Sequence, residues 1–205
     1  IFENTEATNI LKRDDGYVVV TKYGIMIKCS KIVCSSGYNT SFLTDEKLCD
    51  KFISYTIVTN PLKNFSWKDG VLLQDNENPY HYIRSTFDNR IVVGGEDILF
   101  KNNVISEKVA EKKYDKLFKF LKTLFIKLPK NIKIDYKFCG AFSSTKNNLA
   151  VMGESKTNPD IWLLLGYGAN GIIYSIYGAQ KLVQKYHGLK DEFFEKHFSP
   201  KRVLP

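Results

Sequence analysis

The chain has 205 residues, 43% of them apolar and 14% aromatic, which is enough to bury the core of one large domain or two small ones. The net charge is +8, but only Arg13, Arg84, Arg90 and Arg202 among the 30 basic residues are arginines. Nucleic-acid recognition favours arginine forks, and the sequence has neither a bilayer-length apolar run nor an apolar leader, so we expect a cytoplasmic protein without nucleic-acid or membrane partners.

Cysteine and histidine are too scattered to indicate a metal or redox site. The four cysteines have no C-x-x-C spacing, and the three histidines lie far apart in the sequence. We therefore expect reduced thiols and no structural metal.

The first 38 residues read as short strands separated by turns. The segments GYVVVT (16–21), IMIKCS (25–30) and KIVCSSGY (31–38) are rich in β-branched residues, and the last one ends in a glycine turn.

A second group of strands follows from Phe52. Four strand-like segments between Phe52 and Asp97 are separated by Pro, Gly, Asn and Asp, which predicts an antiparallel sheet. A helix is expected from Ser106 to Leu128, ended by Pro129 and packed on one face of that sheet. Its apolar stripe comprises Val109, Leu117, Phe118, Leu121, Leu124, Phe125 and Leu128.

The C-terminal part combines extended segments with a last helix. IDYKFCGAF (134–142) reads as extended chain, and IWLLLGYG (161–168) is an apolar strand of the kind that is buried on both faces. A helix is expected from Asn170, with Gly188 where it stops.

The segment LGYGANGI (165–172) places three glycines between this strand and this helix. Glycine lets a backbone come close to a ligand, and a helix start offers unpaired N–H groups and a partial positive charge, so a phosphate or an electron-rich ring would fit there. The alternative is a strand-to-helix turn that needs glycine for its backbone alone.

Four segments in a fixed order carry a family resemblance: DGYVVVTKYGIMIKCSKIVCSSGY, YHYIRSTFDNRIVVGGED, YKFCGAFSSTKNNLAVMGE and LLLGYGANGIIYS. Together they resemble the FAD-dependent oxidoreductases of the D-amino acid oxidase, glycine oxidase and sarcosine oxidase (DAO) family. The likeness covers the C-terminal portion of such a protein. Members begin with a strand, a G-x-G-x-x-G turn and a helix that hold the FAD pyrophosphate, and we expect this N-terminal segment to be missing here, through cleavage, truncation or a split gene.

The resemblance implies an α+β fold, in which the remnant of an α/β FAD-binding domain is combined with an antiparallel-sheet substrate domain. Residues 1–45 and 138–205 would be parts of the FAD-binding domain. Residues 46–137 would form the substrate-binding sheet and its helix.

The resemblance also implies where FAD would lie. The turn of LGYGANGI approaches the pyrimidine end of the flavin, and the helix start faces the N1–C2=O2 edge, where backbone donors stabilise the charge of the reduced ring. Ala7 would contact adenine through its backbone, and the CSSGY segment would lie near the phosphates. The alternative is that Ala7 and the CSSGY segment are ordinary strand ends without a cofactor contact. The cofactor-binding residues implied are Ala7, Ser35, Ser36, Gly37, Gly166, Tyr167, Gly168, Asn170, Gly171 and Ile172.

On the substrate side, the strand YHYIRST would lie over the flavin. Alternation puts Tyr80, Tyr82 and Arg84 on one face of this strand, with His81 and Ile83 on the other, and the first three are the candidate substrate-binding residues. Arg84 either holds a substrate carboxylate or pairs with Glu96 or Asp97 as scaffold.

Two positions depart from the pattern of the amino-acid oxidases. Phe142 stands where many members have a carboxylate-binding arginine, and Asn147 stands where an acidic residue is usual. These departures weaken an assignment to D-amino-acid or glycine oxidation. Cys139 lies near the position where sarcosine oxidases tether flavin, and we expect it to be a small buried hydrophobe without a covalent flavin.

The resemblance implies that the full-length parent oxidises a C–H next to an amine by hydride transfer to flavin. No side-chain general base is needed for this reaction, so no catalytic residue is assigned. We expect FAD in the parent and little or none on this portion alone. The expected partners are an amine or amino-acid substrate and the missing N-terminal segment, with a homo-oligomer as an open alternative. The rival interpretation is a non-catalytic binding or assembly subunit that pairs with a separate nucleotide-binding chain.

Overall fold

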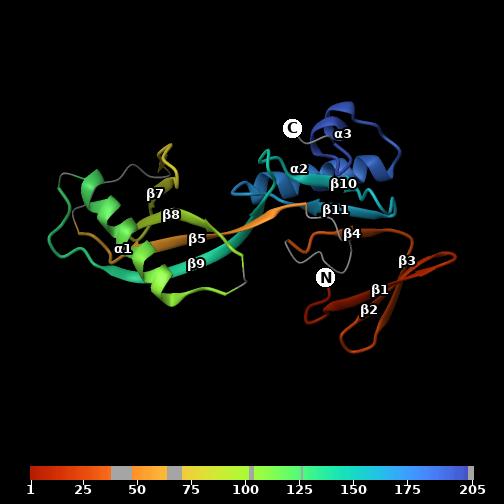
Figure 1. The fold of residues 1–205 in the computed structure, drawn as a ribbon, viewed down its shortest axis with the longest axis horizontal. Helices are drawn as coiled ribbons and strands as arrows, with labels where there is room; N and C mark the ends of the chain where they lie inside the picture. The colour runs from red at the N-terminus through yellow and green to blue at the C-terminus, as the bar shows by residue number, and fades with distance from the viewer. Residues whose placement is uncertain (38–47, 64–70, 102–103, 126, 203–205) are drawn as a thin grey trace. The chain divides into compact units, whose positions relative to one another are not determined.

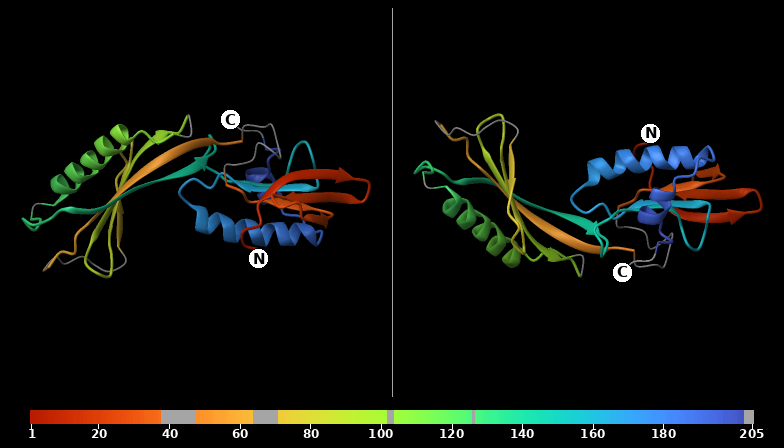
Figure 2. Two further views of the ribbon diagram at one scale, coloured as in Figure 1. Left: turned by 90° about the horizontal axis from the view of Figure 1, so that it is seen from below. Right: turned by 90° about the horizontal axis from the view of Figure 1, so that it is seen from above.

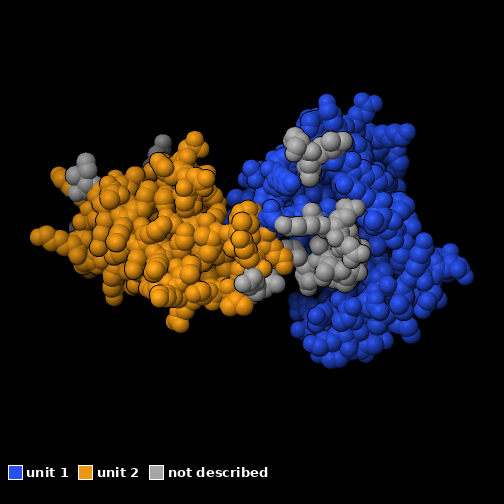
Figure 3. Space-filling model, in the orientation of Figure 1, with its two compact units in different colours: residues 1–50, 142–205 blue, residues 51–141 orange. Residues whose placement is uncertain are grey.

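The computed structural model describes residues 1–37, 48–63, 71–101, 104–125 and 127–202. The fold is α+β, as expected from the sequence (Figure 1). The chain divides into two compact units: unit 1 contains residues 1–50 and 142–205, and unit 2 contains residues 51–141 (Figure 3). Unit 2 is thus an insertion in the chain of unit 1. The assignment of residues 1–45, 46–137 and 138–205 to cofactor and substrate domains stays a prediction.

The first sheet of unit 1 is an antiparallel meander. Its strands are β1 (Ala7–Arg13), β2 (Gly16–Thr21) and β3 (Met26–Cys29), and they pair in chain order. The strands expected at 16–21 and 25–30 are confirmed. Tyr17 of β2 is buried, and its hydroxyl accepts a hydrogen bond from the side-chain amide of Asn158 at 2.8 Å. The meander is thus held to the loop at residues 155–160, which connects two strands of the second sheet.

The second sheet of unit 1 has the order β10 (Val151–Glu154), β11 (Ile161–Leu165), β4 (Ile32–Cys34). β11 is antiparallel to β10 and parallel to β4. All five residues of β11 are buried, which confirms a strand covered on both faces. Since β4 and β11 run in the same direction, their carboxyl ends lie at one edge of the sheet.

Two helices cover one face of this second sheet. α2 (Gly171–Tyr186) and α3 (Glu192–Phe198) supply Leu182, Phe194 and Phe198 to a core with Met152, Trp162 and Leu164 of β10 and β11. A Cβ at Gly178 of α2 would lie 2.3 Å from the side chain of Leu164, so glycine is needed for α2 to approach the sheet this closely. The expected helix from Asn170 is confirmed, with Asn170 as its N-cap and Gly188 just beyond its end at φ +78°.

Unit 2 is a five-stranded sheet with a helix on one face (Figure 2). β7 pairs antiparallel with both β6 and β8, and β8 pairs antiparallel with β5, which confirms the expected antiparallel sheet. The strand order is β6 (Leu72–Gln74), β7 (His81–Ser85), β8 (Ile91–Leu99), β5 (Asp50–Thr59) and β9 (Ile134–Ser144).

The helix α1 (Glu107–Leu124) differs in two details from the expectation. It ends at Leu124 and not at Leu128, because Phe125 has extended backbone angles (φ −111°, ψ 121°). Its buried stripe is Ala110, Tyr114, Leu117 and Leu121, while Val109 and Leu124 are exposed. Cys139 of β9 packs against this core as a small hydrophobe. Among the described residues no helix is long and apolar enough to cross a membrane.

A cluster of charged side chains joins α1 to the sheet. The Glu96 carboxylate, 7% exposed, accepts hydrogen bonds from Lys113 Nζ at 2.7 Å and Lys116 Nζ at 3.3 Å. The His81 ring lies 3.5 Å from Glu96, 2.7 Å from Asp75, and stacked on Phe120. Burial opposes ionisation of Glu96, but the two lysines outweigh it and lower the pKa. Its stabilising contribution is thus present above the unfolded pKa and is lost as the pH falls through the folded pKa.

We expect Glu96→Gln to lower the free energy of unfolding by about 3 kcal/mol at neutral pH, because Lys113 would stay buried without its counter-charge. Urea denaturation measures the change. The matched control is Glu111→Gln, which breaks the exposed Glu111–Lys137 pair and should cost less than about 1 kcal/mol. Equal losses for the two variants would contradict the role given to the Glu96 cluster.

Candidate functional site

The glycine turn after β11 has a backbone that only glycine adopts easily. Gly166 and Gly168 have φ values of +71° and +55°. The Gly168 amide donates to the Ser143 carbonyl at 2.8 Å, and Tyr167 forms a bridge with Ser144, so the turn is held against the end of β9. A Cβ at Gly166 would lie 2.7 Å from Cys49 Sγ. Gly166 is therefore required by the fold itself.

The start of α2 leaves backbone donors free for another group. Asn170, the N-cap, makes no side-chain capping hydrogen bond, so the first N–H groups of α2 have no intrahelical or side-chain partner within the described residues. Ile172, in this first turn, is 80% exposed. The φ of Gly171 is outside the left-handed region, and a Cβ there would meet Tyr167 at an ordinary 3.7 Å. The fold does not need glycine at this position, which leaves room for a ligand to come close to the backbone.

The structure brings two of the implied cofactor segments to one edge. Ser35, Ser36 and Gly37 directly follow β4, and the turn beginning with Gly166 directly follows β11. Because β4 and β11 are parallel neighbours, with Leu163 opposite Cys34, both segments leave the sheet at the same carboxyl edge. Ligands of open α/β sheets bind at this edge.

Ala7 is not brought to this edge by any strand pairing. It is the first residue of β1, in the separate meander, and pairs with Thr21 of β2. It is exposed. Its implied backbone contact with adenine stays a prediction.

The expectation that the G-x-G-x-x-G spacing belongs to the missing N-terminal segment alone is wrong. Gly166, Gly168 and Gly171 have that same spacing, between a strand and a helix. The structure argues against a pyrophosphate site here, because α2 leads into α3 and not into a second parallel strand. Asp191, about 20 residues on, where a ribose-binding acid is expected, caps α3 and pairs with Lys181 at 2.6 Å.

Two side chains of unit 1, Cys49 and Arg202, give no signal in the sequence. Cys49 lies under Gly166, and burial raises its pKa to about 11, so it is a neutral thiol at physiological pH. The Arg202 guanidinium donates to the carbonyls of Ala150, Leu149 and Phe198 and to Asn147 Oδ1. Asn147, one of the departures noted above, therefore anchors the chain after α3 to the loop before β10. These contacts join residues far apart in sequence, so periodicity could not have revealed them.

The candidate substrate residues lie on the sheet face opposite α1, here called the tyrosine face and defined by Tyr80, Tyr82, Arg84, Thr56 and Asp97. Ile83 is buried toward α1 and His81 stacks on Phe120, so the predicted alternation of this strand is confirmed. The Tyr82 ring crosses over Gly94 to Thr56, with 3.1 Å between the hydroxyl oxygens. A Cβ at position 94 would collide with that ring.

Arg84 does not take the scaffold role considered above. Glu96 is paired with lysines on the α1 side of the sheet, and Arg84 is exposed and makes no ion pair with a described residue. Asp97 lies beside Tyr80, whose pKa is raised by burial and by the carboxylate. The guanidinium is therefore free to meet a carboxylate from outside the described chain.

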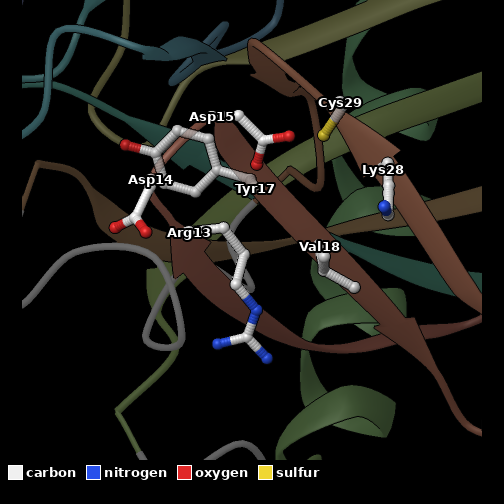
Figure 4. A pocket seen from close by; sticks show the side chains of 7 residues that line it. All are labelled: Arg13, Asp14, Asp15, Tyr17, Val18, Lys28 and Cys29. Carbon is white, nitrogen blue, oxygen red and sulfur yellow. The ribbon is translucent and has the colours of Figure 1, made fainter.

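Two surface pockets lie away from all these residues. One, of about 540 Å³, is lined by the meander residues shown in Figure 4: Arg13, Asp14, Asp15, Tyr17, Val18, Lys28 and Cys29. Another, of about 560 Å³, includes Lys31, Trp162 and Lys185 in its lining. Lys31 pairs with Asp160, and Lys185 pairs with Glu154 and Glu195. Neither pocket contains a candidate cofactor- or substrate-binding residue. Among the described residues no group of three potential metal ligands converges.

Comparison with known proteins points to one family. The family model described as FAD dependent oxidoreductase (DAO) matches residues 1–185. Among curated proteins no sequence matches. Glycine oxidase from Geobacillus kaustophilus is similar in structure, with a TM-score of 0.72 and 17% identity over 100% of this chain and 54% of its own.

Two further structures show the same fold. L-proline dehydrogenase from P. horikoshii has a TM-score of 0.75 and 16% identity over 97% of this chain and 54% of its own. L-α-glycerophosphate oxidase from Mycoplasma pneumoniae, with FAD bound, has a TM-score of 0.70 and 19% identity over 98% and 54%. The chain thus spans about half the length of these structures.

The two outer glycines of the turn should respond differently to alanine. We expect Gly166→Ala to cost about 1 to 3 kcal/mol in the free energy of unfolding, because of its left-handed φ and the approach of Cys49. Gly171→Ala should leave that free energy unchanged or slightly higher, since alanine favours a helix. Urea denaturation of both variants checks this. A comparable loss in Gly171→Ala would show that the fold needs that glycine.

Proposed function

The chain belongs to the DAO family of FAD-dependent oxidoreductases, and we propose that it forms the flavin-edge and substrate-side portion of an enzyme that oxidises a C–H next to an amine. The observation that carries the proposal is the shared edge of the second sheet. There the segments after β4 and β11 leave side by side, and α2 begins with uncapped backbone donors.

The residues of the turn after β11 and of the α2 N-terminus are better explained by a bound FAD than by a turn with a structural role alone. Gly171 leaves space that the fold does not require, and the N–H groups of Gly171 and Ile172 have no capping side chain. In the proposed arrangement Tyr167, Gly168 and Asn170 shape the turn beside the flavin edge, and Ser35, Ser36 and Gly37 lie toward the phosphates. When bound, FAD supplies the acceptor for a hydride from the substrate carbon. The α2 N-terminus would stabilise negative charge at the ring edge.

The chain's own contribution on the substrate side would be orientation. Arg84 offers a guanidinium fork to a carboxylate, and the rings of Tyr80 and Tyr82, whose centroids are 6.4 Å apart, offer a wall for the carbon skeleton. Since the glycerophosphate oxidase among the similar structures is not named for an amine, the fold does not fix the substrate class. The amine is our inference from the family resemblance.

We further propose that a strand and helix from outside these 205 residues cover the neighbouring apolar surface and hold the pyrophosphate. β4 is an edge strand, and Val33, 51% exposed, lies opposite Trp162 on the face that carries α2. On α2 itself Ile172, Ile173, Ile176 and Val183 are each at least 59% exposed. A parallel strand added to β4, followed by its helix, would bury this surface. A cytoplasmic location and a homo-oligomer stay untested proposals.

The alternative function is a non-catalytic binding or assembly subunit. In that case the apolar surface around α2 would pair with a separate nucleotide-binding chain, and no flavin chemistry would take place at the turn.

Flavin content separates these functions. We expect the protein encoded by the full open reading frame to carry about one FAD after desalting, and its flavin colour to bleach with an amine substrate under anaerobic conditions. The 205-residue chain alone, incubated with excess FAD and desalted, should keep no stoichiometric flavin, because dinucleotide affinity comes largely from the pyrophosphate turn and the ribose-binding acid.

Stoichiometric FAD on the 205-residue chain would contradict the need for a further segment. A full-length protein without FAD would contradict the enzyme and favour the binding subunit.

A further inference from the structure

The segment from residue 143 to residue 150 links β9 to β10 in unit 1 and is here called the supporting loop. It begins with three polar residues, Ser143, Ser144 and Thr145, each of which is at most 8% exposed. Buried polar side chains are uncommon unless hydrogen bonds satisfy them. Their burial shows that the supporting loop is enclosed by other parts of the chain.

The supporting loop holds the glycine turn and the start of α2. Ser143 accepts a hydrogen bond from the turn and Ser144 forms a bridge with it, as described above. The Tyr174 hydroxyl, in the first turn of α2, donates to the Asn148 carbonyl at 3.3 Å. The position of the glycine turn and of the uncapped N–H groups that follow it therefore depends on the position of the supporting loop.

Arg202, which follows α3, joins the supporting loop to that helix. Its Nη1 donates to the carbonyls of Ala150 and Phe198 at 2.9 and 2.8 Å. Its Nη2 donates to the Leu149 carbonyl at 2.8 Å and to Asn147 Oδ1 at 3.2 Å. Three of these acceptors belong to the supporting loop, and Phe198 is the last residue of α3. Only a guanidinium presents two NH₂ groups in one rigid plane, so it can bind both segments at once.

Charge pairing does not explain an arginine at position 202. Arg202 forms no ion pair with a described residue, its four acceptors are neutral, and its buried Nε–H has no hydrogen-bond partner among the described residues. Burial lowers the pKa of the guanidinium, which means that its surroundings disfavour the charge. Desolvating a charge is costly unless a counter-charge offsets it. The four hydrogen bonds, by contrast, do explain the arginine.

We propose that Arg202 is a positioning residue for the flavin. Its guanidinium fork fixes the supporting loop against α3, and the loop fixes the glycine turn and the α2 N-terminus where their N–H groups meet the ring edge. Arg202 acts through the loop and contacts neither cofactor nor substrate. That the turn meets a flavin rests on the proposed function, whereas the hold on the turn stands on this chain's own contacts.

The first test measures amide hydrogen exchange by mass spectrometry in the protein encoded by the full open reading frame. We expect Arg202→Met to speed exchange at least tenfold in peptides that cover the glycine turn and the first turn of α2, and to leave α1 unchanged. Arg202→Lys should have a similar effect, because one ammonium group cannot replace the fork although it keeps the charge.

The matched control is Arg13→Met, which also removes one arginine. Arg13 is exposed, and its one hydrogen bond to a described residue is a 3.4 Å contact with the Lys12 carbonyl. Exchange at the glycine turn should therefore stay within twofold of the parent in this variant.

The second test reads the flavin of the same full-length protein. A displaced α2 N-terminus would stabilise the negative charge of the reduced ring less. We expect a more negative reduction potential, measured by anaerobic titration against a reference dye, in both Arg202→Met and Arg202→Lys. Since lysine keeps the charge, a shift in both variants identifies the hydrogen-bond geometry as the cause. Arg13→Met should keep the parental potential.

Tyr174→Phe tests the second step of the path without a change of charge. It removes the bond to Asn148 and keeps the ring beside Phe198, so it should fold and speed exchange at the start of α2. In the Arg202→Met background its effect should be smaller, because both changes act on the same path. If Arg202→Met does not fold, Arg202→Lys and Tyr174→Phe decide the outcome.

The inference is overturned if exchange at the turn is unchanged in the Arg202 variants, if exchange rises equally throughout the protein, or if Arg202→Lys keeps the parental potential. A full-length protein without FAD would contradict the proposed function, and the exchange data would still decide whether Arg202 holds the turn. FAD at the parental potential in both Arg202 variants would overturn this inference and leave the proposed function intact.

Discussion

The parallel pairing of β4 with β11 is the constraint on which the rest of unit 1 depends. β11 is buried on both faces, so its position is fixed by packing against Met152 and Leu182 on one side and Cys34 and Val151 on the other. Because β4 runs parallel beside it, Gly37 and Gly166 emerge at one edge. The start of α2 follows from the same arrangement, since the turn leads directly into it.

Unit 2 depends on the asymmetry of its sheet. α1 covers one face of the sheet with its apolar stripe, and Lys113 of α1 pairs with Glu96. The residues of that face therefore stabilise the fold. The opposite face carries tyrosines, an arginine and a carboxylate that the core does not use. Residues that contribute little to folding are free to serve recognition.

Much of this arrangement could be predicted from local patterns, and the exceptions have physical causes. The alternation in β7 correctly separates Tyr82 from Ile83, and the apolar run of β11 indicates a strand buried on both faces. The considered ion pair between Arg84 and Glu96 does not form, because Gly95 and Glu96 have φ values of +128° and +56°. This bulge turns Glu96 toward α1 and Asp97 toward the tyrosines. The position of Cys49 beneath Gly166 could not be predicted, because the two residues are far apart in the sequence and meet only in the folded chain.

The position of the α2 N-terminus relative to bound FAD tests the account most directly. A crystal structure of the full-length protein with FAD would give the distances from the Gly171 and Ile172 amide nitrogens to the cofactor. We predict that the pyrimidine edge of the flavin ring lies within hydrogen-bond distance of one of them. A pyrophosphate at that turn, or a flavin far from it, would contradict the assignment of this turn to the flavin edge.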